Sequence, residues 1–186
     1  MVDCEVYVDN CYSKKIISQK LYDICSIKSD IVFVFIGTDA NIGDSLGPIC
    51  GNLTGFSGSN CLFYGDLTNT ITAKDVPYLV NFIKNSHPSS FIVTVDAALG
   101  DVTDIGTIKI CQRGIKPGLG VNKDLPAVGD AAIISVVGEK KPDGTLNTVL
   151  RLGAVYKIAK TISDGIAGYL NLKSASGDYM AFNKKL

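Results

Sequence analysis

The sequence has little histidine and no excess charge of either sign. Among its 186 residues there is one histidine, His87, in the segment NSHPSS. A Ser/His/Asp or Cys/His site would need this side chain at the carboxyl ends of the strands. His87 instead precedes a predicted strand of about six residues, which places it about 20 Å from that edge, so we expect it in a turn. Lys and Arg number 18, as do Asp and Glu, so net charge gives no reason to expect binding to nucleic acid or to an anionic membrane.

The sequence also lacks an apolar run of the roughly 20 residues that span a bilayer. Its acidic start, MVDCEVYVDN, has no basic segment followed by an apolar one, as a signal peptide would. No run of Pro, Ser or charged residues divides the chain. We therefore expect a cytoplasmic protein with one domain over residues 1–172 and a loose tail over residues 173–186.

The cysteines form no C-x-x-C pair and no His–Cys cluster with the spacing of a zinc site. Because their surroundings are mostly apolar, we interpret them as small buried side chains in a reducing compartment. There are six of them: Cys4, Cys11, Cys25, Cys50, Cys61 and Cys111. The sequence therefore predicts no cofactor and no resident metal.

What is present is an alternation of segments with strand and helix periodicity. Continuous apolar runs predict five strands in the segments 31–37, 61–67, 91–100, 107–111 and 131–138. Within the third segment, FIVTVDAALG, we expect the strand to end at Asp96. Helical spacing of apolar residues predicts helices at 14–28, 45–55, 73–86 and 146–170. Residues 97–106 are too few for a helical crossover, so the fourth strand is predicted to run antiparallel to the third. The pattern predicts a three-layer α/β/α domain.

The first predicted strand leads into a glycine-rich segment, IGTDANIGDSLGP (Ile36–Pro48). A strand that ends in such a loop and opens a helix often binds phosphate. Here the glycines do not spell G-x-G-x-x-G, and Gly43-Asp44-Ser45 stands where a P-loop has Gly-Lys-Ser or Gly-Lys-Thr. An aspartate in place of that lysine would repel phosphate, so nucleotide binding is not expected at this loop.

Two aspartates follow predicted strands at their carboxyl ends. Asp44 comes after the first strand, and Asp96 lies at the end of the third. In an open α/β sheet, ligands bind at that edge, so the two carboxylates would converge if the strands are neighbours. Two close carboxylates do not easily both ionise, which makes one a general base and the other a general acid. The alternatives are that Asp44 is the N-cap of the next helix and that Asp96 binds loop amides.

Three motifs in this order resemble the YyaC-type sporulation proteins of endospore-forming Firmicutes and, more distantly, the germination protease. They are GDSLGP (Gly43–Pro48), VDAALG (Val95–Gly100) and GIKPGLGVNKDLPAVGD (Gly114–Asp130). The resemblance implies the phosphorylase/hydrolase-like fold of hydrogenase maturation endopeptidases. That fold has a mixed five-stranded sheet of order 2-1-3-5-4 in chain numbering, with strand four antiparallel.

The same resemblance implies site residues. The proposed catalytic pair of the germination protease corresponds to Asp44 and Asp96, and its glycine-rich loop corresponds to Gly114–Lys123. Candidate substrate-binding residues are therefore Asp39, Gly118, Gly120, Asn122, Lys123 and Asp124. In the hydrogenase maturation relatives, acidic residues at the two aspartate positions help to bind nickel together with a histidine from the later loop. This sequence has no histidine there.

These observations predict a sporulation-associated peptidase that hydrolyses amides with the Asp44/Asp96 pair in the cytoplasm of a forespore or mother cell. Its partner would be a protein or peptide, and the chain could form a homo-oligomer. One alternative is a binding or regulatory module without catalysis on a peptidase fold. Another is a hydrolase that holds Mg, Ca or Mn on the two carboxylates.

Overall fold

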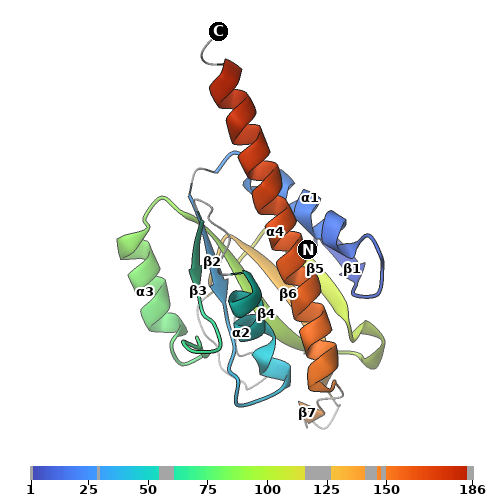
Figure 1. Cartoon of the computed structure of the whole chain (residues 1–186). Helices are drawn as coiled ribbons and strands as arrows, with labels where there is room; N and C mark the ends of the chain where they lie inside the picture. The colour runs from blue at the N-terminus through green and yellow to red at the C-terminus, as the bar shows by residue number, and fades with distance from the viewer. Residues whose placement is uncertain are drawn as a thin grey trace.

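The computed structural model describes residues 2–28, 30–54, 61–115, 127–140, 146–147 and 150–183. In this part of the chain seven strands form one mixed sheet of order β1-β5-β6-β4-β2-β3, with β7 beside β6 (Figure 1). The strands are β1 (Cys4–Tyr7), β2 (Ile31–Phe35), β3 (Cys61–Tyr64), β4 (Phe91–Gly100), β5 (Thr107–Cys111), β6 (Ala131–Lys140) and β7 (Leu146–Asn147).

The central order β3-β2-β4-β6-β5 confirms the predicted order of five strands. β2 is parallel to β3 and β4, β4 is parallel to β6, and β5 is antiparallel to β6, as the short connection after β4 predicted. The strands β1 and β7 were not predicted. β1 has only four residues, of which Val6 alone is buried, so its apolar signal is weak. It pairs with β5 at the edge of the sheet.

Helices cover both faces of the sheet. They are α1 (Ser13–Cys25), α2 (Leu46–Thr54), α3 (Val76–Ser86) and α4 (Leu152–Asn183), with short 3-10 turns η1 (Gly43–Ser45) and η2 (Val102–Asp104). Residues of α1, α2 and α4 share the large core on one face, and α3 packs on the other face over β2. The predicted start of the last helix and the predicted loose tail are both wrong. Residues 146–147 form β7, and α4 continues to Asn183, beyond the sheet (Figure 1).

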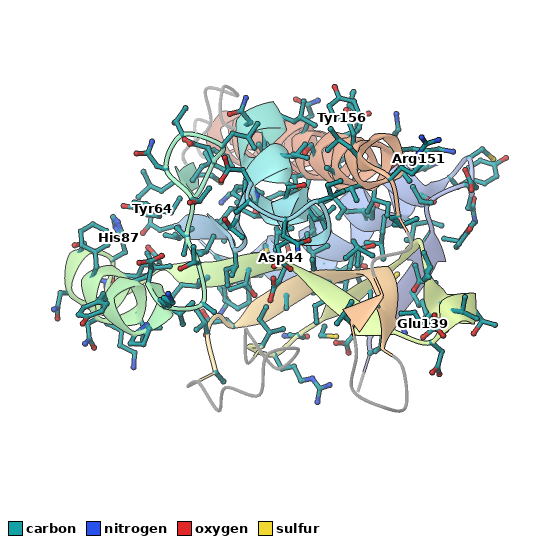
Figure 2. The ribbon with its side chains drawn as sticks, turned by 90° about the horizontal axis from the view of Figure 1, so that it is seen from below. Asp44, Tyr64, His87, Glu139, Arg151 and Tyr156 are labelled. Atoms are coloured by element: carbon teal, nitrogen blue, oxygen red, sulfur yellow. The ribbon has the colours of Figure 1, made fainter. Side chains whose placement is uncertain are left out.

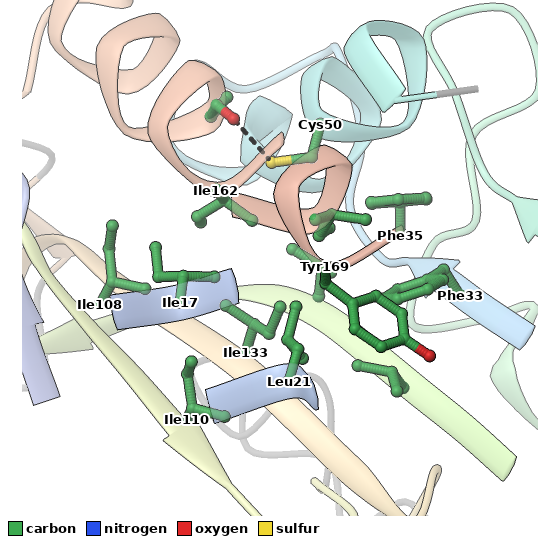
Figure 3. Packing of buried hydrophobic residues seen from close by; sticks show 14 of the residues in the cluster. Ile17, Leu21, Phe33, Phe35, Cys50, Ile108, Ile110, Ile133, Ile162 and Tyr169 are labelled. Carbon is green, nitrogen blue, oxygen red and sulfur yellow. Dashed lines mark hydrogen bonds between the residues drawn. The ribbon is translucent and has the colours of Figure 1, made fainter. Parts of the chain in front are cut away.

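The strand β2 contributes to the cores on both faces. Ile31, Phe33 and Phe35 enter the large core, and Figure 3 shows Phe33 and Phe35 there. Both rings stack with that of Phe63 in β3. Val32 and Val34 enter the smaller core under α3. A strand buried on both faces requires a continuous apolar run, which is why IVFVF predicted it correctly.

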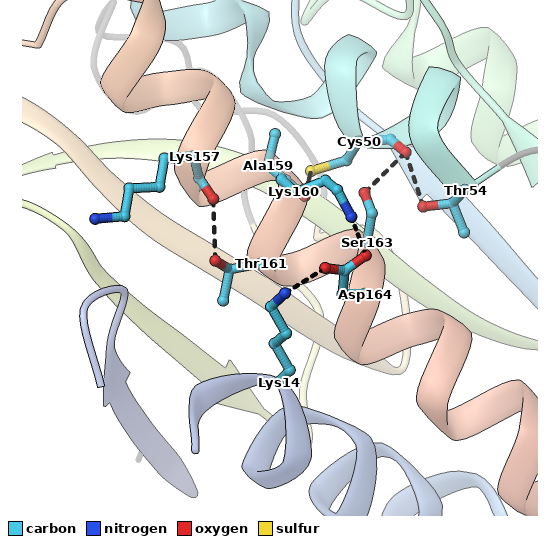
Figure 4. Close-up of polar contacts among 9 residues, drawn as sticks. All are labelled: Lys14, Cys50, Thr54, Lys157, Ala159, Lys160, Thr161, Ser163 and Asp164. Carbon is cyan, nitrogen blue, oxygen red and sulfur yellow. Dashed lines mark hydrogen bonds and ion pairs between the residues drawn. The ribbon is translucent and has the colours of Figure 1, made fainter. Parts of the chain in front are cut away.

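Polar contacts tie α1, α2 and α4 together above this core (Figure 4). The Ser163 hydroxyl of α4 donates to the carbonyl oxygen of Cys50 in α2, and the Cys50 thiol donates to the carbonyl oxygen of Ala159. On the outer side, Asp164 forms ion pairs with Lys14 of α1 and Lys160. These contacts fix α2, and with it the 3-10 turn that precedes it, relative to the sheet.

All six cysteines are free thiols. Four are buried as predicted: Cys25, Cys50, Cys61 and Cys111. Cys4 is half-buried, and the prediction is wrong for Cys11, which is exposed in the turn before α1. Within the described ranges, no helix is long and apolar enough to cross a membrane.

Candidate active site

Two glycines bring the loop after β2 back against the end of that strand. A Cβ on Gly37, whose φ is +147°, would lie 2.0 Å from the carbonyl oxygen of Asp44. A Cβ on Gly47 would lie 2.0 Å from the carbonyl oxygen of Ile36. Both are close backbone approaches that only glycine permits. They hold η1, and therefore Asp44, over the carboxyl end of β2, where the Thr38 N–H donates to the Asp44 carbonyl oxygen at 3.1 Å.

Asp44 lies within η1 and not at a helix cap. Ile42 occupies the N-cap position of η1, and no side chain caps that turn. The alternative interpretation of Asp44 as an N-cap is therefore wrong, because the chain enters α2 through a 3-10 turn that starts one residue earlier. Asp44 is exposed, and its carboxylate has no hydrogen-bond partner among the described residues. Its charge is free to act on a ligand or on a neighbouring carboxyl group.

Asp96 lies in β4 beside the point where β2 ends. The last residue pair of the β2–β4 ladder is Phe35 with Val95, and the Ile36 N–H still donates to the Val95 carbonyl oxygen at 2.8 Å. β4 does not end at Asp96 as predicted but continues to Gly100, because the long strand β6 goes on pairing with it. Val93 and Val95 face the large core, so Asp96 points to the opposite face of the sheet.

The two carboxyl groups influence each other. The pKa of Asp96 is raised to about 7, mainly by burial of its carboxyl group. The Ala97 N–H donates to Oδ1 of Asp96 at 2.8 Å, which lowers this pKa, and the charge of Asp44 raises it. The pKa of Asp44 is also raised, by partial burial of its carboxyl group. Asp96 therefore keeps its proton to a higher pH than an ordinary aspartate, and the exposed Asp44 is the more readily ionised partner. Figure 2 shows Asp44 near the carboxyl end of β4.

Of the candidate substrate-binding residues, Asp39 is exposed on the loop between β2 and η1. Gly118, Gly120, Asn122, Lys123 and Asp124 lie outside the described residues. The two ends of their loop are joined by a β-bridge, in which the backbones of Ile115 and Val128 exchange two hydrogen bonds of 3.0 and 2.8 Å. Val128 is buried in the smaller core, on the face of the sheet to which Asp96 points.

His87 lies away from this pair, as predicted. It follows α3, and its Nε2 is 2.7 Å from the hydroxyl oxygen of Tyr64; Figure 2 shows both at one edge of the molecule and Asp44 nearer its centre. Beside it, a hollow of about 510 Å³ is lined by residues at the amino ends of β2 and β3 and before β4. Because the candidate carboxylates lie at the other end of the strands, this hollow is not part of their site.

The donor set at the two aspartates does not fit a resident metal site. Among the described residues, no three His, Cys, Asp or Glu side chains gather closely enough to hold an ion. The two carboxylates described here are fewer protein ligands than a resident nickel or zinc usually has.

The backbone contribution to this site, namely the N–H group of Ala97 and the part of β4 that extends past β2, was not predicted. The signal was present in the lengths of the two apolar runs. Ile31 is level with Phe91, so a strand of ten residues must extend past a neighbour of five.

Comparisons with known proteins agree with this architecture. The structure resembles the crystal structure of a [NiFe] hydrogenase maturation protease, HycI from Thermococcus kodakarensis KOD1, with a TM-score of 0.52 and 18% identity over 82% of this chain and 99% of that chain. At this identity the likeness shows the fold. The sequence is 38% identical over 141 residues to the uncharacterized protein YyaC of Bacillus subtilis (strain 168), covering 74% of this chain and 68% of that protein. The model of the family described as protein of unknown function (DUF1256) matches residues 5–165. The chain therefore belongs to the DUF1256 family, together with YyaC.

Proposed function

We propose that this protein is a peptidase of sporulating cells. Asp44 and Asp96 together hydrolyse an amide bond of the substrate. The observation that carries the proposal is the placement of the two aspartates, Asp44 in η1 after β2 and Asp96 in β4 beside the end of β2, together with a pKa of Asp96 that is raised to about 7, mainly by burial and least by the charge of Asp44. A peptidase-like fold supports the reaction class. The motifs shared with sporulation proteins support the cellular setting, which we take to be the cytoplasm of a forespore or mother cell.

The different surroundings of the two aspartates assign their roles. Ionised Asp44 accepts a proton from water as the water oxygen attacks the amide carbon. Protonated Asp96 gives its proton to the amide nitrogen as the carbon–nitrogen bond breaks. Asp44 then holds a proton and Asp96 is ionised, and exchange with solvent restores the starting state. The partner is a protein or peptide chain, since neither aspartate could bind an anionic phosphate substrate.

The proposal is tested by incubating the protein with an extract of spore proteins and identifying new chain termini by mass spectrometry. Wild type is expected to generate defined termini that Asp96→Asn and Asp44→Asn do not. Cleavage that EDTA abolishes and Mn²⁺ restores would instead favour the metal-dependent hydrolase. Absence of cleavage by wild type at every pH between 4 and 9 would overturn the peptidase and leave a binding module on this fold.

The pH dependence of hydrolysis is predicted by the pKa of Asp96. Below about pH 7 Asp96 is protonated and can act as the general acid, whereas above it the group is ionised. We therefore expect kcat/KM to fall about tenfold per pH unit above pH 7, and to fall at low pH as Asp44 becomes protonated. Initial rates on a cleavable peptide at constant ionic strength, from pH 4 to 9, measure both limbs.

A histidine could produce the same limb near pH 7, and His87 provides the control for this. The variant His87→Gln keeps a hydrogen-bonding side chain beside the Tyr64 hydroxyl but does not titrate. Its limb near pH 7 is expected to be unchanged, with rates within about twofold of wild type. If the limb disappears in His87→Gln, the assignment of the general acid to Asp96 is wrong.

A further inference from the structure

Within the described part of the chain, the carboxyl half of β4 has a neighbouring strand on only one side. Phe91 to Val95 pair with β2 on one side, and the strand pairs with β6 on the other side as far as Gly100. After Phe35 the chain leaves the sheet through Gly37. Residues Ala97 to Gly100 therefore form a sheet edge inside the molecule, at the place where β2 would continue.

The direction of the backbone groups along this edge follows from the pairing of the rest of β4. The Val95 carbonyl oxygen accepts from Ile36 on the β2 side, and the Ile92 carbonyl oxygen accepts from Asp130 on the β6 side. The register between β4 and β6 shifts after Ala98, but the extra residue, Val137, belongs to β6, so β4 itself has no insertion. Because successive residues of a strand face alternate sides, Ala97 and Leu99 then direct their N–H and C=O groups to the open side.

Of these groups, only the Ala97 N–H has a partner among the described residues, namely Oδ1 of Asp96 at 2.8 Å. Among the described residues, the carbonyl oxygens of Ala97 and Leu99 therefore remain as free acceptors, and the Leu99 N–H remains as a free donor. Residues 97–100 are half-buried. Unpaired backbone groups in such surroundings are costly and favour an added strand.

This edge lies beside the candidate catalytic groups. η1, which carries Asp44, contacts β4, and Asp96 immediately precedes the open segment. A chain that pairs with Ala97 and Leu99 would extend along β4 toward the end of β2, past both carboxyl groups. The hydrogen bond between Asp96 and the Ala97 N–H fixes the carboxyl group at the start of this path.

We infer that Ala97–Gly100 binds an extended polypeptide segment as an additional strand in line with β2, and that this pairing presents an amide bond to Asp44 and Asp96. The inference rests on the proposed function for the cleavage step, but not for binding. Recognition through backbone groups selects chains that are unfolded locally, because a helix or an existing sheet strand has no free backbone donors. The substrate class is therefore an unstructured segment or chain end, with alternate side chains facing the two sides of the sheet.

Binding is measured apart from cleavage with an array of overlapping 12-residue peptides that tile β-casein, an unfolded protein. The array is probed with Asp44→Asn, which retains Asp96 and its bond to Ala97. The tightest peptide is then synthesised with an N-methyl group at each backbone nitrogen in turn. Methylation at alternate residues over about four positions is expected to weaken binding at least about tenfold, and methylation between them by less than about twofold. Binding of no peptide, or a loss without alternation, would overturn the inference.

A matched pair of protein variants tests the same edge by changing β4 in place of the peptide. Leu99→Pro removes an N–H that faces the open side, so we expect the dissociation constant to rise about threefold to tenfold while the melting temperature stays near that of wild type. Ala98→Pro removes an N–H that pairs with β6, so its melting temperature is expected to fall. Peptide binding by Leu99→Pro equal to that of wild type would contradict strand addition.

The two proposals fail in different ways. Alternation in the N-methyl series without cleavage by wild type would overturn the peptidase and keep the strand-binding edge. Cleavage by wild type of peptides whose binding shows no alternation would overturn the strand-binding edge and keep the peptidase.

Discussion

Asp96→Asn is expected to lose hydrolysis and to be more stable than wild type at pH 8. The Asp96 carboxyl group has a pKa of about 7 in the folded protein, against an ordinary value near 4, mainly because of burial. Replacing it by the neutral amide removes the charge that is unfavourable in the folded state above that pKa. Loss of a general acid typically lowers the rate by about 10²–10⁴-fold.

The pH dependence of this gain has a definite direction. Below about pH 4 the carboxyl group is neutral in the folded and unfolded states, and its full contribution to stability is present. Between about pH 4 and 7 the unfolded chain releases the proton and the folded protein keeps it, so stability is progressively lost as pH rises. The difference between the two pKa values corresponds to at most about 4 kcal/mol at pH 8, and Asp96→Asn should recover part of it.

The measurement is urea denaturation of wild type and Asp96→Asn at pH 4 and pH 8. The gain is expected at pH 8 and should vanish at pH 4. Asp130→Asn serves as the control, because Oδ2 of Asp130 accepts the Ile92 N–H at 2.8 Å in an exposed position, so its loss of charge should bring no gain at either pH. An Asp96→Asn variant that is less stable than wild type at pH 8 would show that Asp96 has a structural role as an ionised group.

Gly47→Ala is expected to lower both stability and activity strongly. The new Cβ would lie 2.0 Å from the carbonyl oxygen of Ile36, and both groups belong to backbone that no side-chain rotation can relieve. α2 would have to move away from the end of β2, carrying η1 and Asp44 with it. We expect a loss of roughly 2–4 kcal/mol, although alanine is favoured over glycine inside a helix by about 1 kcal/mol.

Gly153→Ala is the matched control for this substitution. Gly153 lies in the first turn of α4, and no atom within 4 Å would meet its Cβ. Here only helix propensity acts, so we expect a gain of up to about 1 kcal/mol. Urea denaturation and peptide hydrolysis of both variants give the comparison. Equal stability of Gly47→Ala and wild type would mean that α2 does not approach β2 as closely as the structure has it.

The parts of the fold that could be predicted are those where burial acts on a long segment. IVFVF must be apolar at every position because both of its faces are covered, and residues 101–106 between β4 and β5 leave no room for a crossover helix. β1 could not be predicted in this way, since a short edge strand buries one side chain and its pairing is decided by β5. α4 is longer than the predicted helix because a helix already formed continues at little cost from one residue to the next.

The location of the candidate site could be predicted from the sequence, but most of its contacts could not. Strand order alone puts Asp44 and Asp96 at one edge, and in the structure the charge of Asp44 raises the pKa of Asp96, although less than burial does. The 3-10 turn that holds Asp44 depends on backbone approaches at Gly37 and Gly47, which leave no periodic pattern in a sequence. The backbone edge of β4 depends on how far two neighbouring strands extend, which only their register decides. Catalysis by the pair remains a prediction.

The pairing of β1 with β5 has a consequence for how the chain folds during synthesis. Cys4 is level with Ile110, and α1 packs against α4, which begins at Leu152. At about 5–20 residues per second, the ribosome needs several seconds to tens of seconds to make the partners of the first 25 residues. Until then Val6, Ile17 and Leu21 have no core to enter. Contacts between segments so distant in the chain are formed late and slowly, so we expect the sheet to close only after most of α4 has left the ribosome.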